Sequence, residues 1–198
     1  MSLPRHRSQI PLFETLDGDR IRIRSFQPGD AEAHFAAIAE SRERVGRWLP
    51  WVPAYESVDD SRDTLARMQA RWLTREDFDG GIFDRQSGAL LGGIGLHPRN
   101  WEFGYFEIGY WLRTSAEGRG YVTEAVRTLT NYLFASLGAH RVEIRCNALN
   151  THSAAVAERV GFVREARLRN TRRDIDGALS DTLIFALTAL DERAALHP

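Results

Sequence analysis

The segment best suited to binding a ligand is Gly118–Gly120, because its two glycines allow a sharp bend. It lies between an aromatic-rich stretch and an amphipathic one. From Tyr121 the apolar residues recur with the period of a helix, which we expect to end at Leu137, just before Gly138. The first turn of a helix presents free backbone N–H groups and the positive end of the helix dipole, and both attract anions. The sequence therefore predicts a phosphate cradle where this helix begins.

Two common phosphate-binding motifs do not fit this segment. The run Gly118–Thr123 lacks the third glycine of the dinucleotide fingerprint, and it lacks the Gly-Lys-Ser/Thr end of a P-loop. Before it, the aromatic and partly alternating stretch Phe106–Leu112 is typical of a strand, and residues 114–120 are typical of a loop. The cradle is thus expected at a strand–loop–helix junction.

The rest of the chain must supply the elements that position this junction. Helical periodicity predicts helices at 31–40, 41–46, 57–74 and 150–160. Alternation and turn residues predict a hairpin at 13–25 around Asp17-Gly18, and further strands at 82–85, 89–96, 141–148, 162–169 and 181–188. We therefore expect an α/β (α+β) fold, a mixed and mostly antiparallel sheet of about seven strands with helices on both faces, rather than a doubly wound sheet.

Several local features are expected within these elements. Asp30 fits the N-cap of the first helix, and Leu73 fits the inward face of the helix at 57–74. Gly80-Gly81 is expected to close that helical unit. The glycines at 92, 93 and 95 indicate either a bulge or the close approach of another backbone.

The bulk composition favours a single domain over residues 1–198, with residues 1–11 as a loose N-terminal arm. Hydrophobic residues make up 43% of the chain and charged residues 27%, and the net charge of -1 gives no reason to expect nucleic acid or a membrane as a partner. The N-terminus lacks the apolar run of a signal peptide, and no segment approaches the length of a membrane span. We therefore expect a cytoplasmic protein.

Cysteine and the basic residues add two further points. Cys146 is the single cysteine, so no disulfide within the chain is possible, and the six histidines show no close ligand spacing, so no metal site is expected. All 26 basic residues are arginine. This reflects either codon bias or an advantage in lacking reactive amines for a protein that handles an amine-modifying reagent.

Four short motifs occur in a characteristic order along the chain. They are RWLPWV at Arg47–Val52, IGYWL at Ile108–Leu112, EGRGYVTEA at Glu117–Ala125, and Asn150-x-x-Ser153 followed by Val160-Gly161-Phe162. In this order, over most of the chain, they resemble the GNAT superfamily of acyl-CoA-dependent N-acetyltransferases. Within it, the chain is similar to the ribosomal-protein N-acetyltransferases of the RimJ/RimL type.

The resemblance implies acetyl-CoA as the cofactor. The thioester carbonyl is then expected near Leu112 and the pantetheine arm near Asn150. Glu117 and Val122 depart from the family's pattern, which has Gln or Arg and a small residue there, and an acidic Glu117 lowers the affinity for a pyrophosphate unless its carboxylate points away. The pyrophosphate is expected on the backbone N–H groups of Gly118, Arg119, Gly120, Tyr121, Val122 and Thr123.

The resemblance also implies the direct attack of a neutral amine on the thioester. Ser153 is then expected to donate a proton to the leaving thiolate, and Glu107 is expected to act as the general base. His97 and His152 are alternative bases, because the ordinary pKa of histidine suits that role. The second base position of the branch falls beside Arg172-Arg173, where Asp174 is only a near neighbour.

The acceptor is expected to be a primary amine. The loop with Trp48 and Trp51 is either a lid over a core edge or a wall of the acceptor pocket, and the pair Arg172 and Arg173 predicts an acceptor with acidic character. The favoured acceptor is a protein N-terminus, for example that of a ribosomal protein. The alternatives are a small-molecule amine, or an acyl-CoA-binding module with little turnover. The branch also implies a homodimer.

Overall fold

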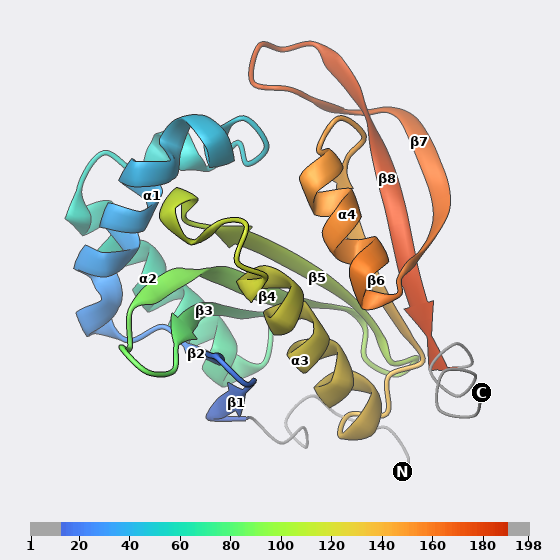
Figure 1. Cartoon of the computed structure of the whole chain (residues 1–198), viewed down its shortest axis with the longest axis horizontal. Coiled ribbons are helices and arrows are strands. Elements are labelled where there is room, and N and C mark those ends of the chain that lie inside the picture. Colours follow the sequence, from blue (N-terminus) through green and yellow to red (C-terminus); the bar gives the residue numbers. More distant parts are fainter. Residues whose placement is uncertain (1–12, 190–198) are drawn as a thin grey trace.

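The computed structural model of this chain describes residues 13–189, which form one eight-stranded sheet with four α-helices around it (Figure 1). The strand order is β1-β2-β3-β4-β5-β6-β8-β7, and all neighbouring strands are antiparallel except β5 and β6. The strands are β1 (Thr15–Asp17), β2 (Ile21–Ser25), β3 (Phe78–Asp84), β4 (Leu90–Asn100), β5 (Tyr105–Leu112), β6 (Arg141–Asn147), β7 (Val163–Arg173) and β8 (Leu179–Thr188).

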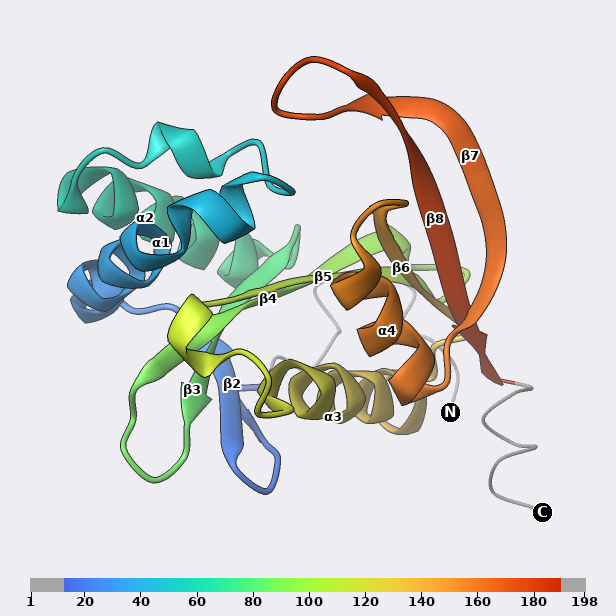
Figure 2. The same cartoon turned by 45° about the horizontal axis from the view of Figure 1, so that its top comes forward.

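Helices cover both faces of this sheet. The α-helices are α1 (Ala31–Gly46), α2 (Val58–Thr74), α3 (Tyr121–Ala135) and α4 (Thr151–Val160). Short 3-10 turns lie at Pro28–Asp30, Val52–Ala54 and Thr114–Ala116. Figures 1 and 2 show α1 and α2 together on one side of the central strands, with α3 and α4 on the other. The predicted fold class is confirmed, with eight strands in place of about seven.

The alternation of β5 produces two cores, one on each face of the sheet. Phe106 and Ile108 point to the α3 face, where they are almost completely buried with Leu129 and Leu133 of α3. Trp111 points the other way and packs against the clusters that α1 and α2 form. Burying one such side chain contributes about 1.5–3 kcal/mol, so β5 is held firmly between the two layers.

The parallel strands β5 and β6 pair over a short distance only. Their register covers Tyr105–Glu107 of β5 against Arg141–Glu143 of β6. Beyond that point β5 continues along β4 as far as Leu112, and β6 continues along β8 as far as Asn147. The two strands therefore part from one another, and the backbone edge of β5 beyond Glu107 has no strand beside it within the described part of the chain.

The glycines of β4 allow neighbouring groups to come very close. A Cβ atom at Gly92 would lie 2.2 Å from the backbone oxygen of Trp111, and one at Gly93 would lie 2.3 Å from the Trp111 indole nitrogen. The strand register also shifts between Ile82 and Phe83, opposite Gly92. Both alternatives raised by the sequence, a bulge and a close approach, therefore occur here.

Several boundaries differ from the sequence-based expectations. Residues 31–46 form one helix rather than two, and β3 begins at Phe78, so Gly80-Gly81 lies inside a strand and does not close the helical unit. The helix after the glycine loop ends at Ala135, two residues before Leu137. The hairpin of β7 and β8 is longer than expected at its turn end and curves away from the body of the sheet in Figures 1 and 2.

Two side chains also differ from expectation. Asp30 makes no side-chain cap bond to α1; its carboxylate binds Arg24 at 2.7 and 2.9 Å and accepts the N–H of Gln27, the N-cap of the preceding 3-10 turn. Leu73 is 62% exposed, since α2 turns its Leu65 side toward the sheet instead. The expected N-terminal arm, residues 1–11, lies outside the described residues. Within residues 13–189 no helix is both long and apolar enough to cross a membrane.

Candidate active site

The glycine loop folds as a cradle at the start of α3. Gly118 and Gly120 have φ values of +74° and +82°, a left-handed conformation that costs glycine little and other residues more. The carbonyl of Gly120 accepts the N–H of Glu124 at 3.0 Å and so begins the helix. The N–H groups before Glu124 in the first helical turn have no intrahelical acceptor. These groups border a cavity of about 440 Å³.

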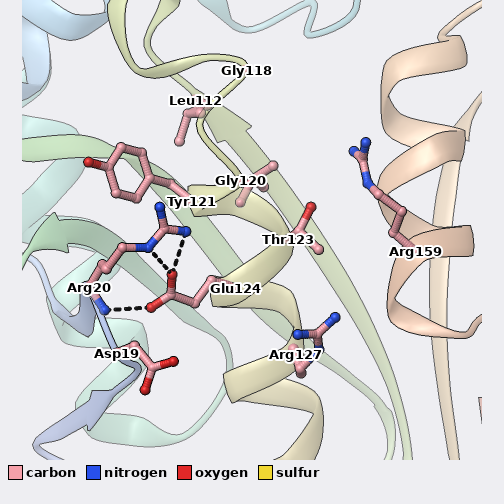
Figure 3. Close-up of a pocket in the computed structure, with 11 residues that line it drawn as sticks. Asp19, Arg20, Leu112, Gly118, Gly120, Tyr121, Thr123, Glu124, Arg127 and Arg159 are labelled. Carbon is pink, nitrogen blue, oxygen red and sulfur yellow. Dashed lines mark hydrogen bonds and ion pairs between the residues drawn. The ribbon is translucent and has the colours of Figure 1, made fainter.

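Arginines from three elements surround this cavity (Figure 3). Arg127 lies one turn further along α3, and Arg159 of α4 lies across from the start of α3. Arg20, in the turn before β2, binds the carboxylate of Glu124 at 2.8–2.9 Å and donates to the carbonyl of Arg119 at 3.0 Å. Arg20 thereby fixes the loop to the helix, while Arg127 and Arg159 supply positive charge.

Glu117 is turned away from the cradle by an ion pair. Its carboxylate lies 2.7 Å from the guanidinium of Arg44 on α1, and Glu117 is not among the residues that line the cavity. The adjoining segment is held in the same way, because Glu40 of α1 binds Arg113 and accepts the N–H of Ser115 at 2.7 Å. The Arg113 guanidinium is the main reason that the pKa of Glu40 is lowered to about 2.

These features fit the pyrophosphate of coenzyme A. The free N–H groups of α3, the glycine conformation and Arg127 with Arg159 match an anionic diphosphate. Val122 borders the cavity and also packs partly against the core, and Leu112 at the end of β5 lines the same cavity. The structure thus brings five of the six predicted pyrophosphate residues and Leu112 together at one cavity, whereas Arg119 lies in the loop but does not line it. Their binding roles stay predictions.

A pair of hydroxyl groups spans the space between β5 and α4. The Tyr110 hydroxyl lies 3.1 Å from Ser153 Oγ and 3.0 Å from the Ser153 carbonyl oxygen. Burial raises the pKa of Tyr110 well above its ordinary value, so the phenol stays protonated. Asn150 caps α4 by accepting the N–H of Ser153 at 3.1 Å. Ser153 therefore sits beside the parted strands with a fixed backbone, as a proton donor requires.

Glu107, the expected base, is already engaged. Its carboxylate lies 3.0 Å from the guanidinium of Arg99 and 3.5 Å from that of Arg145. The carboxylate of Glu107 is therefore engaged with two guanidinium groups rather than directed at an acceptor amine. Of the two alternative bases, His152 is exposed on α4, whereas His97 is half-buried on β4 and bonded to a carboxylate.

The predicted acceptor residues lie in two separate regions. Trp51 is 37% exposed and packs edge-on against Trp111, with ring centroids 6.1 Å apart, so it does adjoin the central strands. Trp48 lies under the guanidinium of Arg47, at 4.9 Å. Both readings of this loop, a lid and a pocket wall, are compatible with these contacts.

Arg172 and Arg173 are neighbours at the end of β7. Neighbouring residues on a strand point to opposite faces, and Arg173 donates to the carbonyl of Gly177 in its own hairpin at 2.8 Å. Asp174, the nearest carboxylate to the second base position, accepts hydrogen bonds from Asn147 and Ser180 at 2.6 and 2.7 Å. Arg173 and Asp174 at this end of the hairpin are therefore engaged in hydrogen bonds, in part with Asn147 of β6.

Sequence reasoning missed several residues that contact this site. Tyr110 stands in the IGYWL motif, two residues before Leu112 on the same face, and that spacing could have indicated it. Arg44 gave no signal, since its contact with Glu117 joins residues 73 positions apart. Outside this site, Asp77 and Asp79 flank Phe78 in an alternating pattern that could have marked the true start of β3.

A cleft at a helix N-terminus, beside two strands that part and a half-buried pair of hydroxyl groups, is suited to acyl transfer from a phosphorylated thioester. The chain matches the family model described as "Acetyltransferase (GNAT) domain" over residues 20–163. It is 32% identical over 177 residues to YdaF of Bacillus subtilis (strain 168), provisionally named a ribosomal N-acetyltransferase, which covers 89% of this chain and 95% of that protein.

Solved structures agree with this match. A crystal structure described as a probable acetyltransferase has a TM-score of 0.82 and 31% identity, over 91% of this chain and 99% of that one. RimL, a ribosomal L7/L12 N-acetyltransferase solved with coenzyme A, has a TM-score of 0.81 over 90% of this chain and 99% of that one, and at 19% identity it shares the fold.

The chain belongs to the GNAT acetyltransferase family, and it is an N-acetyltransferase. The family, the enzyme class and acetyl-CoA as cofactor were all predicted from the sequence and are confirmed. The likeness to ribosomal-protein acetyltransferases is confirmed as well.

Proposed function

We propose that this chain transfers the acetyl group of acetyl-CoA to the amine of a protein N-terminus, with a ribosomal protein as the leading acceptor. The observation that carries the proposal is the likeness to YdaF, which extends over 89% of the chain. An N-terminal amine also suits the reaction. Its pKa is about 7.7–8.0, against about 10.4 for lysine, so far more of it is neutral at pH 7.

The described contacts support this reaction on the coenzyme side. When bound, acetyl-CoA supplies an activated thioester. The N–H groups at the start of α3 with Arg127 and Arg159 would hold its diphosphate, and Asn150 and the backbone near Leu112 would hold its reactive arm. Ser153 would give a proton to the departing sulfur, with Tyr110 holding the Ser153 hydroxyl in place.

The test is a thiol-release assay on a matched panel of acceptors. It includes one peptide with a free N-terminus, the same peptide with a blocked N-terminus and a lysine, and a polyamine. We expect release with the free N-terminus alone. Ser153→Ala should lower kcat by about 10²-fold, because a positioned acid typically contributes at least that much. Ser136→Ala, an exposed serine at the end of α3, is the control and should leave kcat unchanged.

Two other outcomes would overturn the proposal in different ways. Turnover of the polyamine in preference to the free peptide would show a small-molecule acetyltransferase. Coenzyme binding without turnover on any acceptor would show a binding module. The ion pair of Glu117 with Arg44 removes one motive for that second reading, since it keeps the acidic group off the cradle.

A further inference from the structure

A second cluster of ionisable groups lies on the sheet face opposite the hydroxyl pair. The ligand-type atoms of Asp77, Asp79 and His97 all lie within 4.8 Å of one another. His97 Nδ1 is 2.6 Å from one oxygen of Asp77, and Arg71 of α2 binds the other oxygen. Both oxygens of Asp77 are thus taken, whereas among residues 13–189 no hydrogen bond is made to His97 Nε2 or to the carboxylate of Asp79.

These two groups converge over glycine. An ideal Cβ at Gly95 would lie 2.6 Å from Asp79 Oδ1 and 2.7 Å from His97 Nε2. An ideal Cβ at Gly109 would lie 3.3 Å from the same His97 nitrogen. A side chain at Gly95 would occupy the space between Asp79 Oδ1 and His97 Nε2. The glycine therefore keeps the point between Asp79 and His97 clear.

The point between Asp79 and His97 lies close to the place where β5 parts from β6. Gly109 is the second residue after Glu107, the last residue of β5 that pairs with β6. Tyr110 follows directly and points to the other face, where it meets Ser153. A proton acceptor and a proton donor thus lie on opposite faces of β5, at the place where its edge becomes free.

The surroundings of Asp79 suit a cation. Within residues 13–189 no hydrogen bond or ion pair to its carboxylate is present, and burial raises the pKa of Asp79. Tyr55 lies nearby. Its pKa is raised mainly by burial, and the negative charge of Asp79 raises it further. A half-buried carboxylate that accepts no hydrogen bond is costly to keep ionised, and a bound ammonium group would lower that cost.

We infer that this cluster is the acceptor-amine site: Asp79 binds the protonated amine, His97 Nε2 takes its proton, and Asp77 is a positioning residue that holds the imidazole. The inference rests on the proposed function and completes its proton transfers. Its substrate class is a primary amine presented as an ammonium ion.

The atoms balance as follows. His97 takes one proton from the ammonium ion and later releases it to solvent. The amine nitrogen forms its bond to the carbonyl carbon, and the carbon–sulfur bond breaks with its electron pair left on sulfur. The sulfur receives a proton from Ser153, and the second proton lost by the nitrogen restores that hydroxyl. The products are an amide and a free thiol.

Charged groups on every neighbouring element bear on His97. Burial by itself lowers the pKa of His97, but the hydrogen bond to Asp77 and the charges of Asp77, Asp79 and Glu107 outweigh it, so the pKa is raised from its ordinary value. Arg71 pairs with Asp77, and Arg99 pairs with Glu107. The raised pKa brings His97 closer to the pKa of an N-terminal amine, which favours proton transfer between them.

The first test uses binding and needs no turnover. In one experiment the peptide Ala-Ala-Ala amide is titrated into the full chain in the presence of coenzyme A, and its Kd is measured. In a second experiment NMR measures the pKa of His97 in the chain without coenzyme A. Asp79→Asn should weaken peptide binding about tenfold or more, while Asp63→Asn, an exposed carboxylate on α2, should not. Asp77→Asn should lower the pKa of the His97 signal, which His97→Gln identifies by its loss.

The second test uses rates. His97→Gln should lower kcat by about 10²-fold or more with an unchanged Kd for acetyl-CoA, and His140→Gln, an exposed histidine, should not. In the native enzyme kcat/KM should rise with pH through the His97 pKa. In Asp77→Asn that rise should move to lower pH.

The outcomes separate the two claims. The inference is overturned if the Kd of the peptide for Asp79→Asn is within twofold of that for the native chain. It is also overturned if the pH profile of kcat/KM is the same in Asp77→Asn as in the native enzyme. Lack of turnover with every amine overturns the proposed function alone. Peptide binding that depends on Asp79 would then still support the amine site.

Discussion

The ion pair with Arg44 keeps the carboxylate of Glu117 away from the phosphate cradle, so that this carboxylate does not weaken the binding of a diphosphate. Arg44→Ala should free this carboxylate beside the expected diphosphate and weaken acetyl-CoA binding about three- to tenfold at low salt, through repulsion between like charges. Glu117→Gln alone should change the Kd little. Isothermal titration calorimetry of the native chain, both single variants and the double variant gives the comparison.

The double variant is the control for that prediction. If repulsion is the cause, Arg44→Ala with Glu117→Gln should recover the native Kd, because no carboxylate remains to be released. A double variant as weak as Arg44→Ala would instead point to a loss of α1 structure and would contradict the electrostatic account.

Single residues also show which features of the site could be predicted from the sequence. Ser153 and Asn150 lie where the motif suggested, because both are set by the local geometry of one helix start. Glu107 does not have the freedom expected of a base. Its partners Arg99 and Arg145 come from two other strands, and a pattern of apolar periodicity carries no information on which charges meet across a sheet.

Among the elements, α1 has the role that the sequence described least well. A break was expected near Ser41, yet the helix runs on, because Ser41 is buried and accepts the N–H of Thr114 at 2.9 Å. Helix α1 thereby fixes the segment before the glycine loop. That bond joins residues 73 positions apart, and local propensity around Ser41 could not reveal it.

The contact between α1 and α2 should make stability depend on pH. His34 of α1 is buried with its Nδ1 3.0 Å from Ser61 Oγ of α2, and burial lowers the pKa of His34 to about 4. The unfolded chain, with a histidine pKa of about 6.5, therefore binds more protons between these values. Stability should fall as the pH falls through this window, by about 3 kcal/mol in all from this group.

Urea unfolding of the native chain and of His34→Gln between pH 7 and pH 4 measures this effect. The variant starts less stable, since it alters a buried contact, but its stability should decline less steeply over the same window. Equal slopes for the two proteins would assign the pH dependence to other groups.

Across the whole molecule, the strands and their mostly antiparallel arrangement could be predicted from alternation and turn residues. The parting of β5 from β6 could not. Beyond their short register, β6 continues along β8 and β5 continues along β4. Such pairings join distant parts of the chain, and no local pattern records them.

The brief register between β5 and β6 also divides the molecule into units of cooperative opening. Within residues 13–189 the backbone ladder between the sheet's β1–β5 part and its β6–β8 part consists only of the pairing of Tyr105–Glu107 with Arg141–Glu143. Separation at this seam breaks fewer ladder bonds than separation between β3 and β4, so we expect the two parts to behave as distinct foldons. Native-state hydrogen exchange should show amides at the seam exchanging through a sub-global opening. Acetyl-CoA bound at the proposed site between α3 and α4 should slow that opening, because a ligand that contacts both parts stabilises the closed state.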